Sequence, residues 1–517
     1  MLWFVLCCVA ILTRPTFAQL PELIGVIKGE PNTLLGWEIV GLGDQNGDGY
    51  DDILVYDWRE TPLPKVHRAK LFYGGPTLDT VPDLIVTDSV YGGLNNLGDL
   101  NGDGFNDFSV TSWSGGYRKD KVYWGGPLAD GLEDLRFGNA VFRPYQQGVR
   151  GNDIDADGLD ELIWNDDGNL AFGLFHYQAP ADSNPFLRIT PANAAPGYSF
   201  ADQIVAGDFN GDGRTDVAVN RRYDAPDSIN GQVYIYFGGP TFDTIPDMII
   251  TRPGSFASNQ NMWGERMACL DFNGDGYDDL YVAAEPSDDS TAFFFFGGSG
   301  FDSLPDMTLF GDAYYVSPAG DVNNDGYDDL IRGLPLPFAG TGWVDIFLGG
   351  PDADSLRDLR IHNTNLPGLN YEVGRSCTGI GDFNGDGIDD FAFDAEGSLG
   401  QGLVYIYAGW SDPQDVDHDY EPTLPSDYTL LHNFPNPFNP ETSIQFGLPV
   451  RTRVSLIVYN ILGAEVTRLT EGTLSAGSYT VVWDGTDSSG RPVASGVYLY
   501  RLSAEGLRIT RKMVLLK

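Results

Sequence analysis

The stretch Asp271-Phe272-Asn273-Gly274-Asp275-Gly276-Tyr277-Asp278-Asp279 has the pattern D-x-N-x-D-G-x-x-D, and close copies of it occur seven times in the 517 residues. The copies begin at Asp44, Asp99, Asp153, Asp208, Asp271, Asp321 and Asp382, so successive starts are separated by 55, 54, 55, 63, 50 and 61 positions. Such an interval is too long for a helical solenoid unit and is typical of one blade of a β-propeller. We therefore predict a chain dominated by a seven-fold repeat.

Each repeat contains the same succession of segments. The acidic loop is followed by a strand such as DDLYVAA, then by a strand that ends in aromatic-Gly-Gly, such as AFFFFGGSG, and then by a connector that closes on an outer strand, as in SGFDSLPDMTLF. With the short segment before the loop, this makes four strands per repeat. No segment shows sustained helical periodicity, so the predicted fold class is all-β.

The ends of the repeat region indicate how the ring closes. The seventh repeat ends at residues 403–410 (LVYIYAGW) without an outer strand, whereas residues 21–27 (PELIGVI) resemble one. A ring avoids exposed sheet edges only when its last blade is complete. We predict a seven-bladed β-propeller over residues 20–410, closed by the N-terminal strand.

The flanking segments differ in composition. Residues 1–18 have the features of a secretory signal peptide, because their apolar run is too short to span a bilayer and ends before a small-residue cleavage site. Residues 411–427 are acidic and contain proline, which is typical of a linker. Residues 428–517 contain short strands separated by Gly-rich turns, which predicts a small β-sandwich. No later segment is apolar enough for a transmembrane span.

The charge of the chain is strongly negative and uneven. With 73 acidic and 31 basic residues, the net charge is −42. Residues 428–517 hold 9 bases and 6 acids, a net of +3, so residues 1–427 carry −45. This excludes nucleic acid as a partner and favours cations or basic partners. Outside the leader only Cys269 and Cys377 remain, and we favour two small buried hydrophobes over a disulfide.

The acidic loop has the donor set of a calcium site. Positions 1, 3, 5 and 9 carry side-chain oxygens, position 6 is always Gly, and position 7 would offer its backbone carbonyl. With only hard oxygen donors, Ca²⁺ is favoured over Zn²⁺ or copper, and Mg²⁺ fits less well. Position 12 is never the Glu of an EF-hand, and the flanking segments are strands. Two copies depart from the pattern, with Glu161 at position 9 and Asn324 at position 4.

We predict up to seven Ca²⁺ ions with a structural role. The side-chain ligands would be Asp44, Asn46, Asp48 and Asp52; Asp99, Asn101, Asp103 and Asp107; Asp153, Asp155, Asp157 and Glu161; Asp208, Asn210, Asp212 and Asp216; Asp271, Asn273, Asp275 and Asp279; Asp321, Asn323, Asp325 and Asp329; and Asp382, Asn384, Asp386 and Asp390. The backbone ligands would be the carbonyl groups of Tyr50, Phe105, Leu159, Arg214, Tyr277, Tyr327 and Ile388. The alternative is that these loops are ordinary polar turns.

The seven copies of D-x-[ND]-x-D-G-x-x-[DE], together with the strand-Gly-Gly endings, resemble the FG-GAP/VCBS repeats of integrin α-subunit propellers and their bacterial relatives. The resemblance covers residues 20–410. It implies a seven-bladed propeller with calcium in loops on one face and interaction surfaces on the other. Integrin ligand binding is not implied, because that activity needs a partner subunit and the chain has no D-x-S-x-S motif.

Residues 428–517 resemble the type A C-terminal sorting domain of the type IX secretion system, which is similar to the Ig-like domain of flagellar hook-capping proteins. The resemblance implies recognition by an outer-membrane translocon and an Ig-like fold. It is carried by Asn433-Phe-Pro435-Asn436-Pro437-Phe438-Asn439-Pro440, Val458-Tyr459-Asn460-Ile461-Leu462-Gly463, Trp483-Asp484-Gly485, Ala494-Ser495-Gly496-Val497-Tyr498 and the terminal residues 512–517.

The sequence is compatible with two functions. The first is a secreted or cell-surface, calcium-binding adhesion or ligand-binding module with an unknown protein or glycan ligand and no catalytic residue or organic cofactor. The second is an extracellular polysaccharide-active enzyme or its accessory carbohydrate-binding protein. The chain has neither an H-E-x-x-H nor a G-x-S-x-G motif, which favours the first. Trp113, Trp263 and Trp343 do not occupy the aromatic position that precedes Gly-Gly in the repeats, and they are candidates for ligand contact.

Overall fold

A computed structural model describes the chain from residue 21 to residue 516. The undescribed segments within this span are 60–65, 88–89, 91, 115–116, 128, 138–148, 152–153, 156–160, 167–170, 177–186, 191–197, 224–230, 241, 254–262, 284–290, 312–313, 337–340, 352, 363–365, 367–368, 398–400, 412–427, 431–432, 434–437, 439–441, 449, 451, 462, 475–476, 484, 489–490 and 505–506. The expected signal peptide (1–18) and nearly all of the expected linker (411–427) therefore lie outside the described residues.

The regular elements of the described residues are all β-strands. None of these residues forms a helix that could cross a membrane. The chain divides into two compact units, of which the first comprises Leu20–Asp415 and the second contains Val416–Lys517.

The described residues of the first unit form seven four-stranded antiparallel sheets, one for each sequence repeat. In order from the inner to the outer strand, sheet 1 is β2 (Leu34–Gly43), β3 (Asp52–Arg59), β4 (Val66–Phe72) and β5 (Leu84–Val86); sheet 2 is β6 (Asn95–Gly98), β7 (Asp107–Ser114), β8 (Tyr117–Tyr123) and β9 (Leu135–Phe137); sheet 3 is β10 (Val149–Gly151), β11 (Glu161–Asp166), β12 (Ala171–His176) and β13 (Leu187–Ile189); sheet 4 is β14 (Tyr198–Gly207), β15 (Asp216–Tyr223), β16 (Gln232–Tyr236) and β17 (Met248–Thr251); sheet 5 is β18 (Arg266–Leu270), β19 (Asp279–Ala283), β20 (Thr291–Phe295) and β21 (Met307–Phe310); sheet 6 is β22 (Tyr315–Gly320), β23 (Asp329–Leu336), β24 (Thr341–Phe347) and β25 (Leu359–His362); and sheet 7 is β26 (Leu369–Gly381), β27 (Asp390–Gly397), β28 (Gln401–Tyr407) and β1 (Leu23–Lys28).

The position of a strand in its sheet explains its sequence pattern. The middle strands β19 (DLYVA) and β20 (TAFFF) are almost wholly buried, because neighbouring sheets cover both of their faces. The outer strand β17 (MIIT) alternates, with Ile250 fully buried and Ile249 41% exposed. Continuous apolar runs and alternating runs therefore belong to different strands of one sheet.

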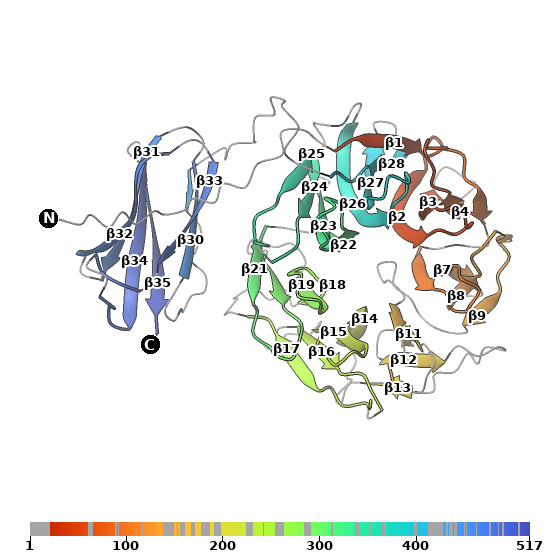
Figure 1. Cartoon of the computed structure of the whole chain (residues 1–517), viewed down its shortest axis with the longest axis horizontal. Coiled ribbons are helices and arrows are strands. Elements are labelled where there is room, and N and C mark those ends of the chain that lie inside the picture. The colour runs from red at the N-terminus through yellow and green to blue at the C-terminus, as the bar shows by residue number, and fades with distance from the viewer. Residues whose placement is uncertain are drawn as a thin grey trace. The chain divides into compact units, whose positions relative to one another are not determined.

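The seven sheets follow one another around a common centre (Figure 1). The inner strands contact their neighbours in the order β2, β6, β10, β14, β18, β22 and β26, and β26 in turn contacts β2. The predicted pairing of an N-terminal strand with the seventh repeat is observed, since β1 runs antiparallel to β28 with Val26 opposite Tyr405. Sheet 7 thus joins segments from opposite ends of the repeat region.

The hydrophobic core of the first unit lies between adjacent sheets. One cluster joins sheets 7 and 1 through Ile27, Val55 and Val404, and another joins sheets 3 and 4 through Phe172, Phe200 and Tyr236. Cys269 and Cys377 are both free thiols. Cys377 is buried, as predicted, whereas Cys269 is half-buried.

The second unit has two sheets that share one core. A three-stranded sheet contains β29 (Thr429–Leu430), β30 (Thr442–Leu448) and β33 (Gly477–Trp483), and a four-stranded sheet contains β32 (Glu465–Leu474), β31 (Thr452–Asn460), β34 (Gly496–Ala504) and β35 (Leu507–Leu515). Ile444, Leu456, Trp483, Tyr500 and Met513 are at most 1% exposed and belong to one hydrophobic cluster. The two sheets therefore pack face to face as a small sandwich.

Candidate functional site: the seven acidic loops

In the six acidic loops whose ligand candidates the structure describes, the side chains at positions 1, 3 and 5 turn inward and accept hydrogen bonds from the loop backbone. In the fifth loop, Asp271 Oδ1 accepts from the N–H groups of Gly274 (2.9 Å) and Asp275 (3.1 Å), and its Oδ2 accepts from Gly276 (2.8 Å). Asn273 Oδ1 accepts from Asp275 N–H at 2.8 Å. The loops that begin at Asp44, Asp99, Asp208 and Asp382 make the same bonds.

The glycines at positions 4 and 6 allow this tight turn. Gly274 has φ +74° and Gly276 has φ +89°, both in the left-handed region that glycine adopts without strain. The sixth loop has Asn324 at position 4, and it takes φ +55°, a conformation that asparagine tolerates. Asp325 and Gly326 still donate to Asp321 at 2.9 and 2.8 Å, so this loop keeps the common turn.

The residue at position 9 is fully buried in all seven repeats and is the first residue of a strand. In sheet 1, Asp52 Oδ2 accepts the N–H of Gln45 at 2.7 Å, and Oδ1 accepts that of Gly74, the first glycine of the Gly-Gly turn, at 2.8 Å. A Cβ on Gly74 would overlap the carbonyl of Asp51. The acidic loop and the Gly-Gly ending, separate in sequence, therefore meet at this carboxylate.

The third copy keeps the bond from position 2 of the loop to position 9, although its residue at position 9 is glutamate. Glu161 begins β11, is fully buried, and its Oε2 accepts the N–H of Ile154 at 2.6 Å. Asp155 is described as well. Asp153, Asp157 and Leu159 lie outside the described residues, whereas the ligand candidates of the other six loops lie within them.

Negative charge is crowded in these loops. Burial, together with the charges of Asp48 and Asp44, raises the pKa of Asp52 to about 7, although the N–H groups of Gly74 and Gln45 lower it. The pKa of Asp329 is raised to about 8 for the same reasons, with Asp325 and Asp321 as neighbours. Three carboxylates that share so small a space repel one another unless a cation offsets their charge.

The fit of the loops to a metal rests on their chemistry. They offer carboxylate, amide and carbonyl oxygens, which are the donors that calcium takes. A carboxylate oxygen with a single hydrogen bond, such as Asp271 Oδ2, keeps a second lone pair for a metal. Among the described residues, no group of three or more His, Cys, Asp or Glu side chains is already arranged to hold a metal ion.

Position 8 links neighbouring loops, a role that was not predicted from the sequence. The carboxylate of Asp278 accepts the N–H of Asp208, the first residue of the previous loop, at 2.7 Å. Asp389 accepts the N–H of Asp321 in the same way at 2.9 Å. Asp51 of the first loop accepts the N–H of Asp382 of the seventh loop at 2.8 Å. The doubled Asp-Asp at positions 8 and 9 was the signal in the sequence that could have revealed this contact.

Position 7 adds a second link between loops. The ring of Tyr277 covers Gly211, position 4 of the previous loop, so closely that a Cβ there would lie 2.7 Å from the ring. Phe105 covers Gly47 in the same manner, and the rings of Tyr327 and Tyr50 would overlap a Cβ on Gly274 and Gly385. Position 4 is thus glycine both for its backbone angle and for the aromatic ring that lies on it.

The candidate aromatic contacts have different environments. Trp263 is 1% exposed and packs on Phe293, so the expectation that it contacts a ligand is wrong. Trp343 is half-buried, with the guanidinium of Arg360 4.4 Å from its ring centroid. The side chain of Trp113 lies outside the described residues. Tyr73, Trp124, Phe237 and Phe296, which precede Gly-Gly, are half-buried.

In the second unit, the motif residues that the structure describes hold the fold. Asn433 is 2% exposed, its backbone N–H donates to the Tyr500 hydroxyl at 2.8 Å, and its Nδ2 donates to Thr442 at 2.9 Å. Phe438 packs on Trp483 with ring centroids 5.5 Å apart. By contrast, Ile461 in the Asn460–Gly463 turn is 70% exposed.

Comparison with known proteins agrees with the division into two kinds of structure. Residues 153–219 match the FG-GAP-like repeat, and residues 439–507 match the FlgD Ig-like domain. Integrin alpha-PS3 of Drosophila melanogaster is 32% identical over 168 residues, covering 29% of this chain and 14% of that protein. Phosphatidylinositol-glycan-specific phospholipase D of Homo sapiens is 30% identical over 185 residues, covering 31% and 22%.

The chain spans less than a quarter of the length of these curated relatives. Among solved structures, it is similar to PorZ, an essential bacterial surface component of the type-IX secretion system of Porphyromonas gingivalis, with 14% identity and a TM-score of 0.35 over 92% of this chain and 60% of that one. By its two family matches, the chain combines an FG-GAP-like repeat region with an Ig-like C-terminal domain.

Proposed function

We propose that the seven sheets of the first unit are the blades of a closed β-propeller, stabilised by calcium, that acts outside the cell as an adhesion or ligand-binding module. The observation that carries the proposal is the link between the first and last repeats. Asp51 of the first loop accepts the N–H of Asp382 of the seventh, and β26 contacts β2. The same contact joins the fifth loop to the fourth and the seventh loop to the sixth, so the seventh sheet meets the first as these consecutive sheets meet each other.

Calcium would be held by the oxygens of positions 1, 3, 5, 7 and 9 of each loop. Its charge would offset the repulsion among carboxylates such as Asp44, Asp48 and Asp52 and would tie the loop to the strand that follows. Extracellular calcium sites typically bind at about 10⁻⁴–10⁻³ M. At a tenfold excess over the dissociation constant, each site would add about 1.4 kcal/mol to the free energy of unfolding.

Chelation tests the calcium proposal. We expect EDTA to lower the melting temperature of the first unit by many degrees, and Asp275→Ala to lower it in part. Asp302→Ala is the matched control, because Asp302 lies in the connector of the same sheet, where it accepts the N–H of Leu304. Its effect should be the same with and without calcium. A melting temperature that EDTA leaves unchanged would refute the metal sites.

The binding role is supported by the similarity to integrin α-subunits and by the leader-like character of residues 1–18. A glycan array and a pull-down from the native cell surface, both in calcium, would identify a ligand. The competing hypothesis, a polysaccharide-active enzyme, is tested with a hydrolase panel on the same preparation. Turnover of any polysaccharide would overturn the binding-module proposal, whereas binding without turnover would support it.

We further propose that the second unit is a type IX secretion sorting domain that an outer-membrane translocon recognises. The matched FlgD Ig-like domain and the sequence motifs support this assignment. Because the described motif residues Asn433, Phe438 and Trp483 are buried, recognition would fall on exposed motif residues such as Ile461.

Export measurements test the sorting proposal. Deleting residues 428–517 should leave a folded first unit in the periplasm, and normal surface delivery of that variant would contradict the assignment. Ile461→Ser should reduce surface delivery without lowering thermal stability. Val450→Ser is the control, since Val450 is also exposed (50%) but lies outside the motifs. Equal delivery of the two variants would remove Ile461 from the recognition surface.

A further inference from the structure

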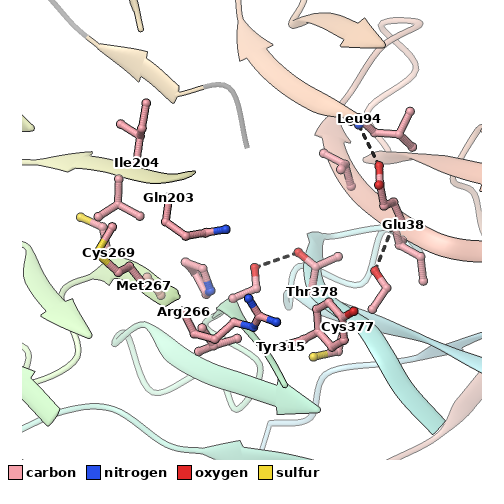
Figure 2. Close-up of a pocket in the computed structure, with 18 of the residues that line it drawn as sticks. Glu38, Leu94, Gln203, Ile204, Arg266, Met267, Cys269, Tyr315, Cys377 and Thr378 are labelled. Atoms are coloured by element: carbon pink, nitrogen blue, oxygen red, sulfur yellow. Dashed lines mark hydrogen bonds between the residues drawn. The ribbon is translucent and has the colours of Figure 1, made fainter. Parts of the chain in front are cut away.

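A cavity of about 250 Å³ lies at the centre of the first unit. Its wall is formed by the inner strands of five sheets, β2, β14, β18, β22 and β26, with Leu94 just before β6 (Figure 2). The volume is just below the range of about 300–1,000 Å³ that drug-sized ligands occupy, so the cavity suits a smaller molecule.

Arg266 is the only basic side chain among the described residues that line this cavity. It is 8% exposed, and its Nε and Nη1 donate to the carbonyl oxygens of Tyr314 and Glu265. Its ion pair with Glu265 Oε1 is long at 3.8 Å. Nη2 has no hydrogen-bond acceptor among the described residues. The guanidinium is therefore fixed in place by carbonyls while its charge is only weakly balanced.

Glu38, the only acidic side chain among the described lining residues, does not supply that balance. Its Oε2 accepts the N–H of Leu94 at 2.9 Å, on the far side of the cavity from Arg266 (Figure 2). Burial raises the pKa of Glu38 to about 8, against the hydrogen bond from Leu94, so at neutral pH it is mostly an uncharged carboxylic acid. A neutral carboxyl group donates one hydrogen bond as well as accepting others.

The remaining wall combines hydroxyl groups with apolar side chains. Ser317 and Thr378 form a hydroxyl pair at 3.1 Å, and Gln203 extends toward the same space as Arg266 (Figure 2). Ile204 and Met267 supply apolar surface. A few convergent polar groups on a partly apolar wall are the usual make-up of a small-molecule site.

We propose that this cavity binds a small organic carboxylate of about monosaccharide size, such as a hexuronate, through the guanidinium of Arg266. A carboxylate is the planar acceptor that a guanidinium fork matches best. The hydroxyl groups of the ligand would then face Glu38, Gln203 and the pair of Ser317 and Thr378. This inference gives the proposed binding module a ligand class and in that sense rests on the proposed function.

The charge of the whole protein predicts an unusual salt dependence. Residues 1–427 carry −45, so an anion approaches this cavity against long-range repulsion. Added salt screens distant charges far more than a buried contact. We therefore expect the affinity for a uronate to rise severalfold between low and physiological salt, whereas anion binding at a basic site weakens.

Ligand-observed NMR and calorimetry on the full chain test the proposal with D-galacturonate as the probe. We expect its methyl ester and D-galactose to bind at least tenfold more weakly, because both lack the charge. Arg266→Gln should weaken galacturonate binding at least tenfold, and Arg266→Lys less. Arg221→Gln is the control, because Arg221 lies over the ring of Tyr234 as Arg266 lies over that of Tyr315, but Arg221 does not line the cavity.

The proposal is overturned if galacturonate and its ester bind equally, if wild type binds neither, or if a folded Arg266→Gln variant keeps wild-type affinity. If that variant fails to fold, the comparison of acid and ester on wild type still decides. Digalacturonate distinguishes two sources of the carboxylate. A site for the end of a polyuronate chain should accept its second sugar, whereas a site for a free monosaccharide acid should exclude it. Chelation tests the acidic loops and the ligand titrations test the cavity. A failure of the calcium proposal is therefore distinguishable from a failure of this one.

Discussion

At the scale of single residues, glycines that share a positive φ have different structural roles. Gly274 and Gly276 both have positive φ, but the space around them differs. A Cβ on Gly276 would meet nothing within 4 Å, whereas one on Gly274 would overlap the ring of Tyr327 from the next loop. One glycine is required by its own turn, and the other also by its neighbour.

Replacing each glycine by alanine should separate these roles. Both variants force alanine into the left-handed region, which costs about 1–2 kcal/mol. Gly274→Ala also overpacks the contact with Tyr327, which adds about 1–3 kcal/mol. Denaturant unfolding in chelator should therefore show the larger loss of unfolding free energy for Gly274→Ala. Equal losses for the two variants would mean that the aromatic ring moves aside without cost.

Glu38 makes the stability of the first unit depend on pH. Its pKa rises from an ordinary 4.5 to about 8 on folding, mainly through burial. Between these values the unfolded chain has released the proton and the folded chain still holds it, so stability falls as pH rises, by at most about 1.4 kcal/mol per pH unit. Below 4.5 and above 8 this contribution is flat.

Glu38→Gln should remove that dependence. We would measure the unfolding free energy of both proteins from about pH 4 to about pH 9. The difference between them should change only between the two pKa values of Glu38, where wild type becomes less stable relative to the variant as pH rises. Parallel curves for the two proteins would contradict a raised pKa at Glu38.

At the scale of elements, the acidic loops connect strands within a sheet and sheets with one another. Position 9 binds the Gly-Gly turn of its own sheet, and position 8 binds the first residue of the preceding loop, as Asp52 and Asp51 do. Sheet 7 depends in addition on β1, whose pairing with β28 covers an edge that would otherwise be open.

Removing residues 21–28 tests how much the pairing of β1 with β28 contributes to the stability of the first unit. Without β1, the strand β28 presents an unpaired edge, and Ile27 is lost from the core between sheets 7 and 1. We expect a marked fall in the melting temperature of the first unit and concentration-dependent association, measured by calorimetry and light scattering. The second unit should melt as in wild type. A first unit that stays monomeric and equally stable would show that β1 is dispensable.

At the scale of the whole molecule, the two units differ in charge. Residues 1–427, which include the first unit, carry −45, and residues 428–517, which include the sandwich of the second unit, carry +3. Carboxylates crowded on the first unit repel one another, and that repulsion is screened by salt. The stability of the first unit should therefore depend on ionic strength, and that of the second unit should not.

Salt titration in chelator measures this difference. Raising sodium chloride from about 0.05 to about 0.5 M should raise the melting temperature of the first unit by several degrees, because the Debye length falls severalfold. The transition of the second unit serves as the internal control and should stay in place. An equal shift of both transitions would indicate a general salt effect instead of charge repulsion.

Local pattern was sufficient for much of this protein. The interval of the D-x-N-x-D-G motif predicted the number of sheets, because a motif that recurs at a blade's length marks one structural unit per copy. The apolar runs predicted four strands per repeat, and residues 21–27 predicted the strand that pairs with the last repeat. Position 9 was identified as the residue that ends each loop, and it begins a strand in all seven repeats.

Only the tertiary structure decided what the loop residues touch across sheets. The contacts of Asp278 with Asp208 and of Tyr327 with Gly274 join residues of different repeats, and periodicity within one repeat carries no information on how repeats pack. The same holds for the cavity, where strands from distant repeats bring Glu38 and Arg266 to one space. The motif predicted to supply cation ligands also joins neighbouring sheets at Asp51, Asp278 and Asp389, because only the packing of the sheets brings position 8 of one loop to position 1 of another.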